Sequence, residues 1–335
     1  MLISFPHSPG SGGPGSFQAR FEAELGNRGW QVEHGPSVRG TLPDVIFVVG
    51  GTRKLPWLAK IKRRGVPIVY RLDGLLWLHR LKGFGSTPSK WLGAEFRNIM
   101  AQIIHSRLAD SVVYQSEFVR EWWSKAGWQP PKCSYVIHNG VDIKEFRPSS
   151  VERARTIVPR LVAVEGHIDY SPYAIDFLNH IARQVKGLGG SLFVYGGFSD
   201  PSNRFRLDDS VQYCGSVSRE AVADVYRDRI FLSLDVNPAC PNSVVEALAS
   251  GAPVIGFDTG SVKELVGDKA GVIAPFGGDP WKGDNPDFAS LVEAYRRIVG
   301  DFKAYSDAAR SRAEKCYDVR KMVDDYIVVI EKTIR

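Results

Sequence analysis

The chain has 335 residues, enough for two domains of ordinary size that each bury their own core. Its 44% hydrophobic and 24% charged residues are typical of a soluble α/β protein and exclude a disordered or fibrous chain. Residues 1–150 carry 20 Lys/Arg and 11 Asp/Glu, whereas residues 151–335 carry 23 and 26. The first half is therefore expected to meet an anionic partner, such as a membrane surface, a nucleic acid or an acidic acceptor.

The lack of a recognisable targeting signal and the spacing of the cysteines both favour a cytoplasmic protein. No apolar run approaches the length of about 20 residues that a membrane span needs, and the N-terminal segment is too short and uncharged for a signal peptide. The four cysteines include no Cys-x-x-Cys pair, so neither a zinc site nor a disulfide framework is expected. Cys240 is expected to be a small packing residue, with a lone reactive thiol as the alternative.

The N-terminal segment predicts a strand, a glycine loop and a helix. Residues 2–5 indicate a short buried strand, and the Gly- and Pro-rich segment 7–16 follows. Ser16 is predicted to cap a helix whose Phe17 and Phe21 face the core. Such a loop lets a backbone approach a diphosphate closely, but the Walker A and dinucleotide spacings are absent. A surface loop remains the alternative interpretation.

The next segments of the first half place polar side chains at strand ends. A strand at 45–49 precedes the basic segment 53–64, whose pattern suits a helix on a membrane or polyanion, or a solvated helix face. A strand at 67–71 brings Asp73 to its carboxyl end, where ligands collect in α/β sheets. Segment 75–90 is interpreted as a binding loop. Its candidate acceptor contacts are Trp77, His79 and Arg80.

The second half repeats the alternation of strands and helices after a polar linker at 149–156. Strands are predicted at 161–164, 192–195, 211–213 and 230–234, and helices at 173–185, 219–226, 288–299, 303–314 and 318–332. Two doubly wound α/β domains with a cleft between them are the economical architecture.

The stretch 237–254 is the main candidate for an anion site. An apolar strand ends in a Pro-bracketed loop, and a helix is predicted to begin at Asn242 or Ser243, both good N-caps. The helix N-terminus favours an anion, usually phosphate. Glu246 lies one turn further on the same face, where its carboxylate suits ribose hydroxyls. The alternative is a capped, half-buried helix without a ligand.

Several motifs together resemble family 4 glycosyltransferases, which have the GT-B fold. The resemblance covers nearly the whole chain and is strongest over residues 135–275. The matching segments, in order and spacing, are 137–148, 211–217, Tyr226, 241–255 and 259–266. It implies an α/β protein of two Rossmann-like domains facing each other across a cleft. These are an acceptor-binding domain at 1–148 and a nucleotide-sugar-binding domain at 149–316, with a helix at 317–335 that crosses back to the first.

The resemblance also implies an activity. It is the transfer of a sugar from a nucleotide-diphosphate sugar, a UDP- or GDP-sugar, to a glycan, glycolipid or polysaccharide precursor. No metal or other cofactor is implied, and the anomeric configuration would be retained. The donor-binding residues implied are Gly13, Gly15, Ser16, Gly166, Tyr213, Gly215, Val217, Asn242, Ser243, Val244 and Glu246.

The sequence departs from the family pattern at three places. Pro238 stands where the first glutamate of a Glu-x7-Glu pair belongs. After Gly166, His167 and Pro172 replace the Arg and Lys that neutralise the diphosphate, and Asp73 replaces a histidine of the first domain. Each departure leaves open a changed donor, lost catalysis or a compensating residue. The candidates for compensation are Arg71, Arg204 and Arg206.

Two of the replacing residues are the catalytic candidates. His167 is expected to donate to a phosphate, and Asp73 to bind acceptor hydroxyls or accept the acceptor's proton. The alternative for Asp73 is a turn residue in Asp-Gly.

Two other functions remain open. One is a non-catalytic nucleotide-sugar binder or scaffold, and the other is glycosylation of nucleic acid, although no recognised nucleic-acid module is present and no nucleic-acid partner is expected. The basic, Trp-containing segments also suggest a peripheral position on the anionic inner face of a membrane.

Overall fold

The computed structural model describes residues 1–10, 12–36, 40–81, 87–149, 160–170 and 173–335. These form two compact units, one of Met1–Gly140 with Val319–Arg335 and the other of Val141–Asp318. Most of the predicted linker, and Pro172, lie outside the described residues. The division falls a few residues from the predicted boundaries at 148 and 316 because Phe146 is buried in the core of the second unit, where Arg310 donates to its carbonyl at 2.8 Å.

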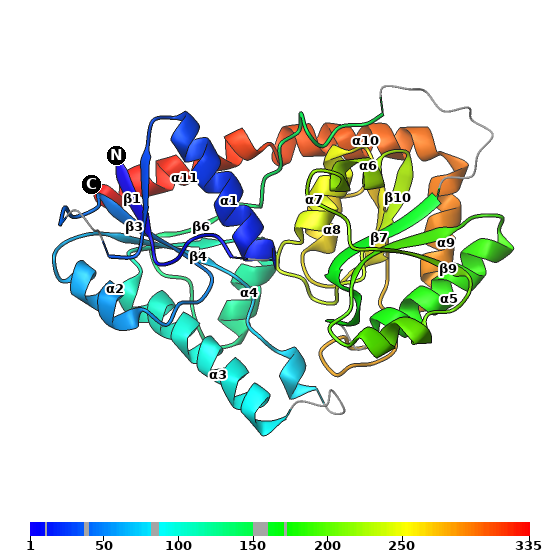
Figure 1. Cartoon of the computed structure of the whole chain (residues 1–335), viewed down its shortest axis with the longest axis horizontal. Helices are drawn as coiled ribbons and strands as arrows, with labels where there is room; N and C mark the ends of the chain where they lie inside the picture. The colour runs from blue at the N-terminus through cyan, green and yellow to red at the C-terminus, as the bar shows by residue number, and fades with distance from the viewer. Residues whose placement is uncertain (11, 37–39, 82–86, 150–159, 171–172) are drawn as a thin grey trace. The chain divides into compact units, whose positions relative to one another are not determined.

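Within its described residues, the first unit contains a six-stranded parallel sheet in the order β2-β1-β3-β4-β5-β6 (Figure 1). The strands are β1 (Leu2–Phe5), β2 (Gln31–His34), β3 (Val45–Val49), β4 (Ile68–Leu72), β5 (Ser111–Tyr114) and β6 (Ser134–Val136). The helices are α1 (Gly12–Asn27), α2 (Leu55–Lys62), α3 (Pro88–Ile103), α4 (Glu117–Lys125) and α11 (Val319–Ile334), with the short turns η1 (Leu78–Arg80) and η2 (Ile104–Leu108).

Two helices from opposite ends of the chain cover one face of this sheet. Helices α1 and α11 lie side by side, with the ring of Tyr326 5.2 Å from that of Phe21 and 5.4 Å from that of Phe47 on β3 (Figure 1). These rings belong to a core cluster that also buries Ile3 and Phe5 of β1. The C-terminal helix is therefore part of the first unit, as its apolar spacing requires.

In the part of the second unit that the structure describes, six parallel strands lie in the order β9-β8-β7-β10-β11-β12. The strands are β7 (Arg160–His167), β8 (Leu192–Gly197), β9 (Val211–Gly215), β10 (Arg229–Leu232), β11 (Val254–Phe257) and β12 (Gly271–Ala274). The helices are α5 (Ala174–Gly187), α6 (Val222–Tyr226), α7 (Asn242–Ala249), α8 (Val262–Val266), α9 (Phe288–Gly300) and α10 (Phe302–Cys316), with the turns η3 (Ile168–Tyr170) and η4 (Pro201–Arg206).

Helices cover both faces of the second sheet. Side chains of α5 and α9 pack on one face, and those of α6, α7, α8 and α10 pack on the other. Cys240 is buried in the second cluster, whereas Cys133, Cys214 and Cys316 are exposed free thiols. None of the helices in the described residues is long and apolar enough to span a membrane.

The strand order places a switch point in each sheet, where consecutive connections leave in opposite directions. It lies between β1 and β3 in the first unit and between β7 and β10 in the second. In open α/β sheets, ligands bind outside the carboxyl ends of the strands at such points. The residues that follow these four strands are therefore the candidates for binding.

One predicted helix start and one predicted N-cap are wrong. Helix α1 begins at Gly12, so Ser16 lies inside it and does not cap it. Helix α7 begins at Asn242 after an extended Pro241, so neither Asn242 nor Ser243 is the N-cap. Propensity favours Ser or Asn at a cap, but Pro241 supplies the extended backbone that a cap position needs.

Candidate functional site

Three strand ends meet at one point of the second unit. Gly166 and His167 end β7, Gly197 ends β8, and Ser216 follows β9. A Cβ atom built on Gly197 would lie 3.5 Å from the Gly166 carbonyl oxygen, 3.7 Å from Ser216 Oγ and 4.0 Å from His167 Cδ2. The structure therefore brings together the predicted Gly166 and His167 with the end of β9 at Gly215, at the carboxyl edge of the sheet.

Helix α7 supplies the predicted helix N-terminus of the same unit. Asn242 and Ser243 occupy its first two positions and are partly exposed, whereas Val244 is buried in the core. The N–H groups of a first helical turn have no partner within the helix, and together with the helix dipole they favour an anion. This geometry fits the predicted diphosphate cradle, although the helix is short.

Glu246 is bound by a buried tyrosine. The hydroxyl of Tyr226, at the end of α6, donates to Glu246 Oε2 at 3.4 Å. The Tyr226 ring is fully buried against Phe146 and Phe231, so the donor is held in place, while the Glu246 side chain remains partly exposed. A carboxylate that is held by a buried donor in a partly exposed side chain is suited to accept hydrogen bonds from a diol such as ribose.

Pro238 lies in a loop that the backbone fixes tightly. A Cβ on Gly260 would overlap Pro238, and Ser261 N donates to the Pro238 carbonyl at 3.0 Å. The preceding Asn237 has a positive φ of 54° and donates from its backbone to Thr259 Oγ1 at 3.4 Å. The missing first glutamate is therefore replaced by a rigid turn between β10 and α7.

The three arginines proposed to compensate have different surroundings. Arg71 is buried in the first unit, and Arg206 lies 3.7 Å from Asp176 in an exposed ion pair. Arg204 lies over the ring of Tyr213 at 5.1 Å, and the Tyr213 hydroxyl donates to the Gly196 carbonyl at 2.9 Å. Arg204 is thus the one of the three that contacts a predicted donor residue.

Two carboxylates that the sequence analysis did not single out lie at the second switch point. Glu165 is near the end of β7 and Asp235 follows β10, the neighbouring strand. Burial raises the pKa of Asp235 to about 6, and burial with the charge of Asp235 raises that of Glu165 well above its usual value. Carboxylates whose pKa values are raised by burial and by a neighbouring charge are common at functional sites.

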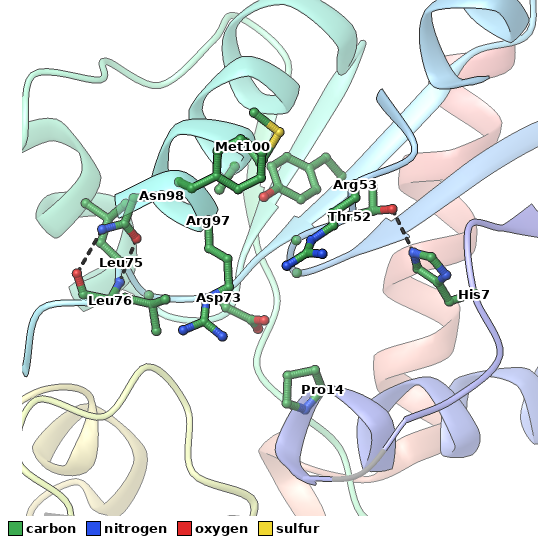
Figure 2. A pocket seen from close by; sticks show the side chains of 16 residues that line it. His7, Pro14, Thr52, Arg53, Asp73, Leu75, Leu76, Arg97, Asn98 and Met100 are labelled. Atoms are coloured by element: carbon green, nitrogen blue, oxygen red, sulfur yellow. Dashed lines mark hydrogen bonds between the residues drawn. The ribbon is translucent and has the colours of Figure 1, made fainter. Parts of the chain in front are cut away.

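The first unit contains a cavity of about 540 Å³ at its switch point (Figure 2). His7 follows β1, Thr52 and Arg53 follow β3, and Asp73 follows β4, all of which line it. His7 Nε2 and Thr52 Oγ1 are 2.8 Å apart, and burial, with the charge of Lys54 adding to it, lowers the pKa of His7. The full lining is His7, Pro14, Gly50, Gly51, Thr52, Arg53, Tyr70, Asp73, Gly74, Leu75, Leu76, Phe96, Arg97, Asn98, Met100 and Ala101.

Asp73 accepts hydrogen bonds from side chains of the first unit. Arg71 Nη1 donates to Asp73 Oδ1 at 3.0 Å, and Gln115 Nε2 donates to the same oxygen. Trp123 Nε1 donates to the Asp73 carbonyl at 3.1 Å, and Gly74 must be glycine because a Cβ there would lie 2.5 Å from the ring of Trp122. The structure therefore gives Asp73 more than the role of a turn residue, since its carboxylate has dedicated donors at the cavity wall.

The predicted acceptor contacts lie elsewhere. His79 Nε2 is 2.7 Å from Glu95 Oε1, and Arg80 forms two hydrogen bonds of 2.6 and 2.8 Å with the Glu95 carboxylate. The hydrogen bond from Arg80 is the main reason that the pKa of Glu95 falls to about 2. Trp77, His79 and Arg80 are not among the residues that line the cavity. The hydrogen bonds of His79 and Arg80 to Glu95 instead attach the turn η1 to α3.

Gly13, Gly15 and Ser16 form the first turns of α1, so they belong to a helix and not to a loop. A Cβ on Gly15 would overlap the carbonyl of Gly10. The glycine therefore allows the incoming chain to pass close to the helix, and its neighbour Pro14 reaches the cavity (Figure 2).

Helix α3 contributes to the cavity, and this contribution was not predicted from the sequence. Asn98 is buried and bonds both backbone groups of Leu76, each at 2.9 Å, so α3 fixes the segment after Asp73 (Figure 2). Arg97 reaches the cavity from the same helix. No strand-end rule identifies a residue in the middle of a helix, so only Asp73 was predicted here.

Part of the chain matches a known protein family, and the whole chain is similar to solved structures. Residues 159–301 match the family model described as glycosyl transferases group 1. No curated protein sequence matches the chain. The structure is similar to that of sucrose-phosphate synthase from Thermosynechococcus elongatus, with a TM-score of 0.71, 15% identity and coverage of 99% of this chain and 98% of that one.

Two further structures are similar over almost their whole length. HepE from Anabaena, solved with UDP and glucose, has a TM-score of 0.70 and 15% identity, with 99% of each chain covered. A glycosyltransferase from Rickettsia africae has a TM-score of 0.68 and 15% identity, covering 100% of this chain and 98% of that one.

The fold is therefore that of GT-B glycosyltransferases, with a Rossmann-like sheet in each unit, which confirms the predicted fold class. Residues 159–301 match the glycosyltransferase group 1 family model, which confirms the predicted class of enzyme. Membership of family 4, retention of configuration and the assignments of individual donor residues stay predictions.

Proposed function

We propose that the chain transfers a sugar from a nucleotide-diphosphate sugar to a glycan, glycolipid or polysaccharide-precursor acceptor. The observation that carries this proposal is the hydrogen bond from Tyr226 to Glu246 one turn inside α7, in the unit that matches the glycosyltransferase family model. In this arrangement the helix N-terminus binds the diphosphate and the carboxylate binds ribose. The complexes of HepE with UDP and with UDP-glucose favour a uridine nucleotide for this chain too.

The proposed reaction needs stabilisation of the diphosphate as the glycosidic bond breaks. Donors at the start of α7 and the exposed imidazole of His167 supply it electrostatically, without a metal ion. The acceptor hydroxyl is assigned to Asp73 in the first unit, which would bind it or accept its proton. Retention of the anomeric configuration is part of the proposal.

The test is release of nucleotide diphosphate from a panel of UDP- and GDP-sugars, with and without EDTA. Turnover is expected to survive EDTA and to fall at least tenfold in Glu246→Gln and in the double variant Ser243→Ala/His167→Ala. Glu293→Gln, an exposed residue of α9, is the matched control and should retain full turnover. Loss of activity in EDTA, or full activity of the double variant, would reject the assignment, and NMR of the product decides between retention and inversion.

A non-catalytic binder is the second candidate. The rigid turn at Pro238, where the first glutamate of the pair is missing, favours it. In that case a nucleotide diphosphate binds through Glu246, but no donor turns over with any acceptor. The third candidate, modification of nucleic acid, would require binding of DNA or RNA that weakens steeply between two salt concentrations.

A peripheral membrane position is also proposed. Helix α3 exposes the apolar side chains of Trp91, Leu92, Phe96 and Ile99, with Leu92 63% exposed, and the first half of the chain is basic. An apolar helix face in a cationic unit suits an anionic lipid surface. Liposomes containing anionic lipid should retain the wild type and release Leu92→Ser/Ile99→Ser, and equal retention of both proteins would contradict this position.

A further inference from the structure

The charges of the cavity in the first unit do not balance. Asp73 is the acidic residue among those that line the cavity, and it already forms an ion pair with the buried Arg71. Arg53 and Arg97 also line the cavity and are exposed, and among the described residues neither has a carboxylate partner. Figure 2 shows Arg53, Asp73 and Arg97 reaching into the same space from three different elements. The cavity therefore has an excess of positive charge and is suited to an anionic ligand.

The uncharged part of the lining is mostly apolar. Leu75, Leu76, Phe96, Met100 and Ala101 lie along the side formed by α3 and the segment after Asp73. Phe96 is 46% exposed, so the apolar wall continues from the cavity to the surface of α3. Burial of such side chains by a ligand is favourable in proportion to the apolar area removed from water.

Polar groups that suit hydroxyls lie on the remaining wall. The Asp73 carboxylate is 31% exposed, and it can accept hydrogen bonds beyond those from Arg71 and Gln115. Burial, with the charge of Asp73 adding to it, raises the pKa of the Tyr70 hydroxyl well above its usual value, so this cavity residue stays a donor. His7 and Thr52 add a hydrogen-bonded pair across the cavity.

We infer that this cavity binds an acidic amphiphile, a molecule that combines sugar hydroxyls, an acidic group and an apolar chain. Asp73 binds the hydroxyls, Arg53 and Arg97 bind the acidic group, and the apolar wall of α3 binds the chain. That this molecule is the sugar acceptor rests on the proposed function. The binding itself does not, because every residue involved lies in the first unit.

Calorimetric titration of the full chain, without any nucleotide, tests separately whether the ligand needs the acidic group and the apolar chain in addition to the sugar hydroxyls. Octyl glucuronide carries all three features, octyl glucoside lacks the acid, and glucuronic acid lacks the chain; glucose 6-phosphate replaces the carboxylate by a phosphate. Below its micelle concentration, octyl glucuronide is expected to bind at least tenfold more tightly than octyl glucoside and than glucuronic acid. Comparison of the two chainless acids shows whether the arginines prefer carboxylate or phosphate.

Charge-matched variants identify the residues. Arg53→Gln/Arg97→Gln should weaken octyl glucuronide at least tenfold, to the level of octyl glucoside, whereas Arg63→Gln/Arg64→Gln removes the same charge from exposed positions after α2 and should change binding less than twofold. Asp73→Asn should weaken both sugar amphiphiles. Equal binding of the two octyl glycosides, equal effects of the two double variants, or no binding of any probe would overturn the inference.

The outcome of these titrations does not depend on whether the second unit binds a nucleotide. If a nucleotide diphosphate binds through Glu246 but octyl glucuronide shows no preference, the inference about the acceptor fails and the proposed function stands. If no nucleotide binds but octyl glucuronide does, the proposed function fails and the ligand class of the cavity is retained.

Discussion

The guanidinium of Arg71 lies 3.0 Å from the carboxylate of Asp73, and only 1% of the Arg71 side chain is exposed. Its other terminal nitrogen donates to Asn139 Oδ1 at 2.7 Å, and its plane lies over the ring of Phe17 at 3.9 Å. Asp73 is therefore oriented by a buried cation that joins three segments of the first unit.

Arg71→Lys should lower the free energy of unfolding by about 1–3 kcal/mol, because a lysine ammonium cannot bond Asp73 and Asn139 in the same geometry and loses the stacking on Phe17. Denaturant titration followed by tryptophan fluorescence measures it. Arg63→Lys, at an exposed position, should stay within about 0.5 kcal/mol of the wild type. Equal stability of the two variants would mean that the buried network does not order the unit.

Gly15→Ala should destabilise the first unit by about 1–3 kcal/mol, because its methyl group would overlap the carbonyl of Gly10 and the chain must move away. Gly26→Ala, in the same helix, has no atom near the new methyl group and should be neutral or stabilising by up to about 1 kcal/mol. Thermal melts of the two variants provide the comparison. If both behaved alike, the close approach of the chain at Gly15 would not be a constraint.

The Glu165 and Asp235 pair predicts a pH dependence of stability. Both pKa values are raised on folding, so the pair favours the folded state at low pH, and this contribution is lost as the pH rises from about 4 through about 6 and above. Asp235→Asn cannot ionise, so its stability relative to the wild type should increase between pH 4 and pH 7, by no more than about 3 kcal/mol. Unfolding at several pH values measures this difference.

The exposed Asp268→Asn is the control for that titration and should show no such trend. A difference between Asp235→Asn and wild type that stays constant from pH 4 to pH 7 would show that the pKa of Asp235 is not raised on folding.

Tyr226→Phe removes the hydroxyl that binds Glu246 and keeps the buried ring. Stability should change by less than about 1 kcal/mol, while the affinity for a nucleotide diphosphate should fall about fivefold, as one lost hydrogen bond implies. Isothermal titration with UDP measures the affinity. Tyr305→Phe, on α10, should leave it unchanged, and an unchanged affinity in Tyr226→Phe would separate Tyr226 from the site.

Much of this fold follows from the sequence because its strands are short, buried apolar runs. Leu2–Phe5 and Val45–Val49 were predicted at their observed bounds, since parallel strands are buried on both faces. The edge strand β2 was missed because its Gln-Val-Glu-His sequence is partly exposed and has no apolar run. The start of α7 at Asn242 was predicted correctly, but its N-cap is Pro241, and α1 begins at Gly12 and not after Ser16. Pro241 and Gly12 are weak signals compared with Asn242 and Ser16.

The candidate sites were predicted unevenly for a similar reason. Glu246 lies in the motif 241–255, so its place one turn inside α7 followed from its spacing after Asn242, whereas Gly166 was implied only by the family resemblance. Asp73 followed from its place after a strand, but its partner Arg71 and the cavity residue Arg97 did not. Their roles depend on which helix packs beside which strand, and this tertiary information is absent from local patterns.

The measurement that tests the account most directly is a thermal-shift screen of UDP, GDP, ADP, CMP and dTDP against wild type, Glu246→Ala and the control Glu293→Ala. A ligand that binds the native protein raises its melting temperature by mass action. We expect one nucleotide, UDP first, to raise the melting temperature of wild type and control, and Glu246→Ala to lose that response. No response to any nucleotide, or an equal response in Glu246→Ala, would contradict the assignment of the second unit as the donor site.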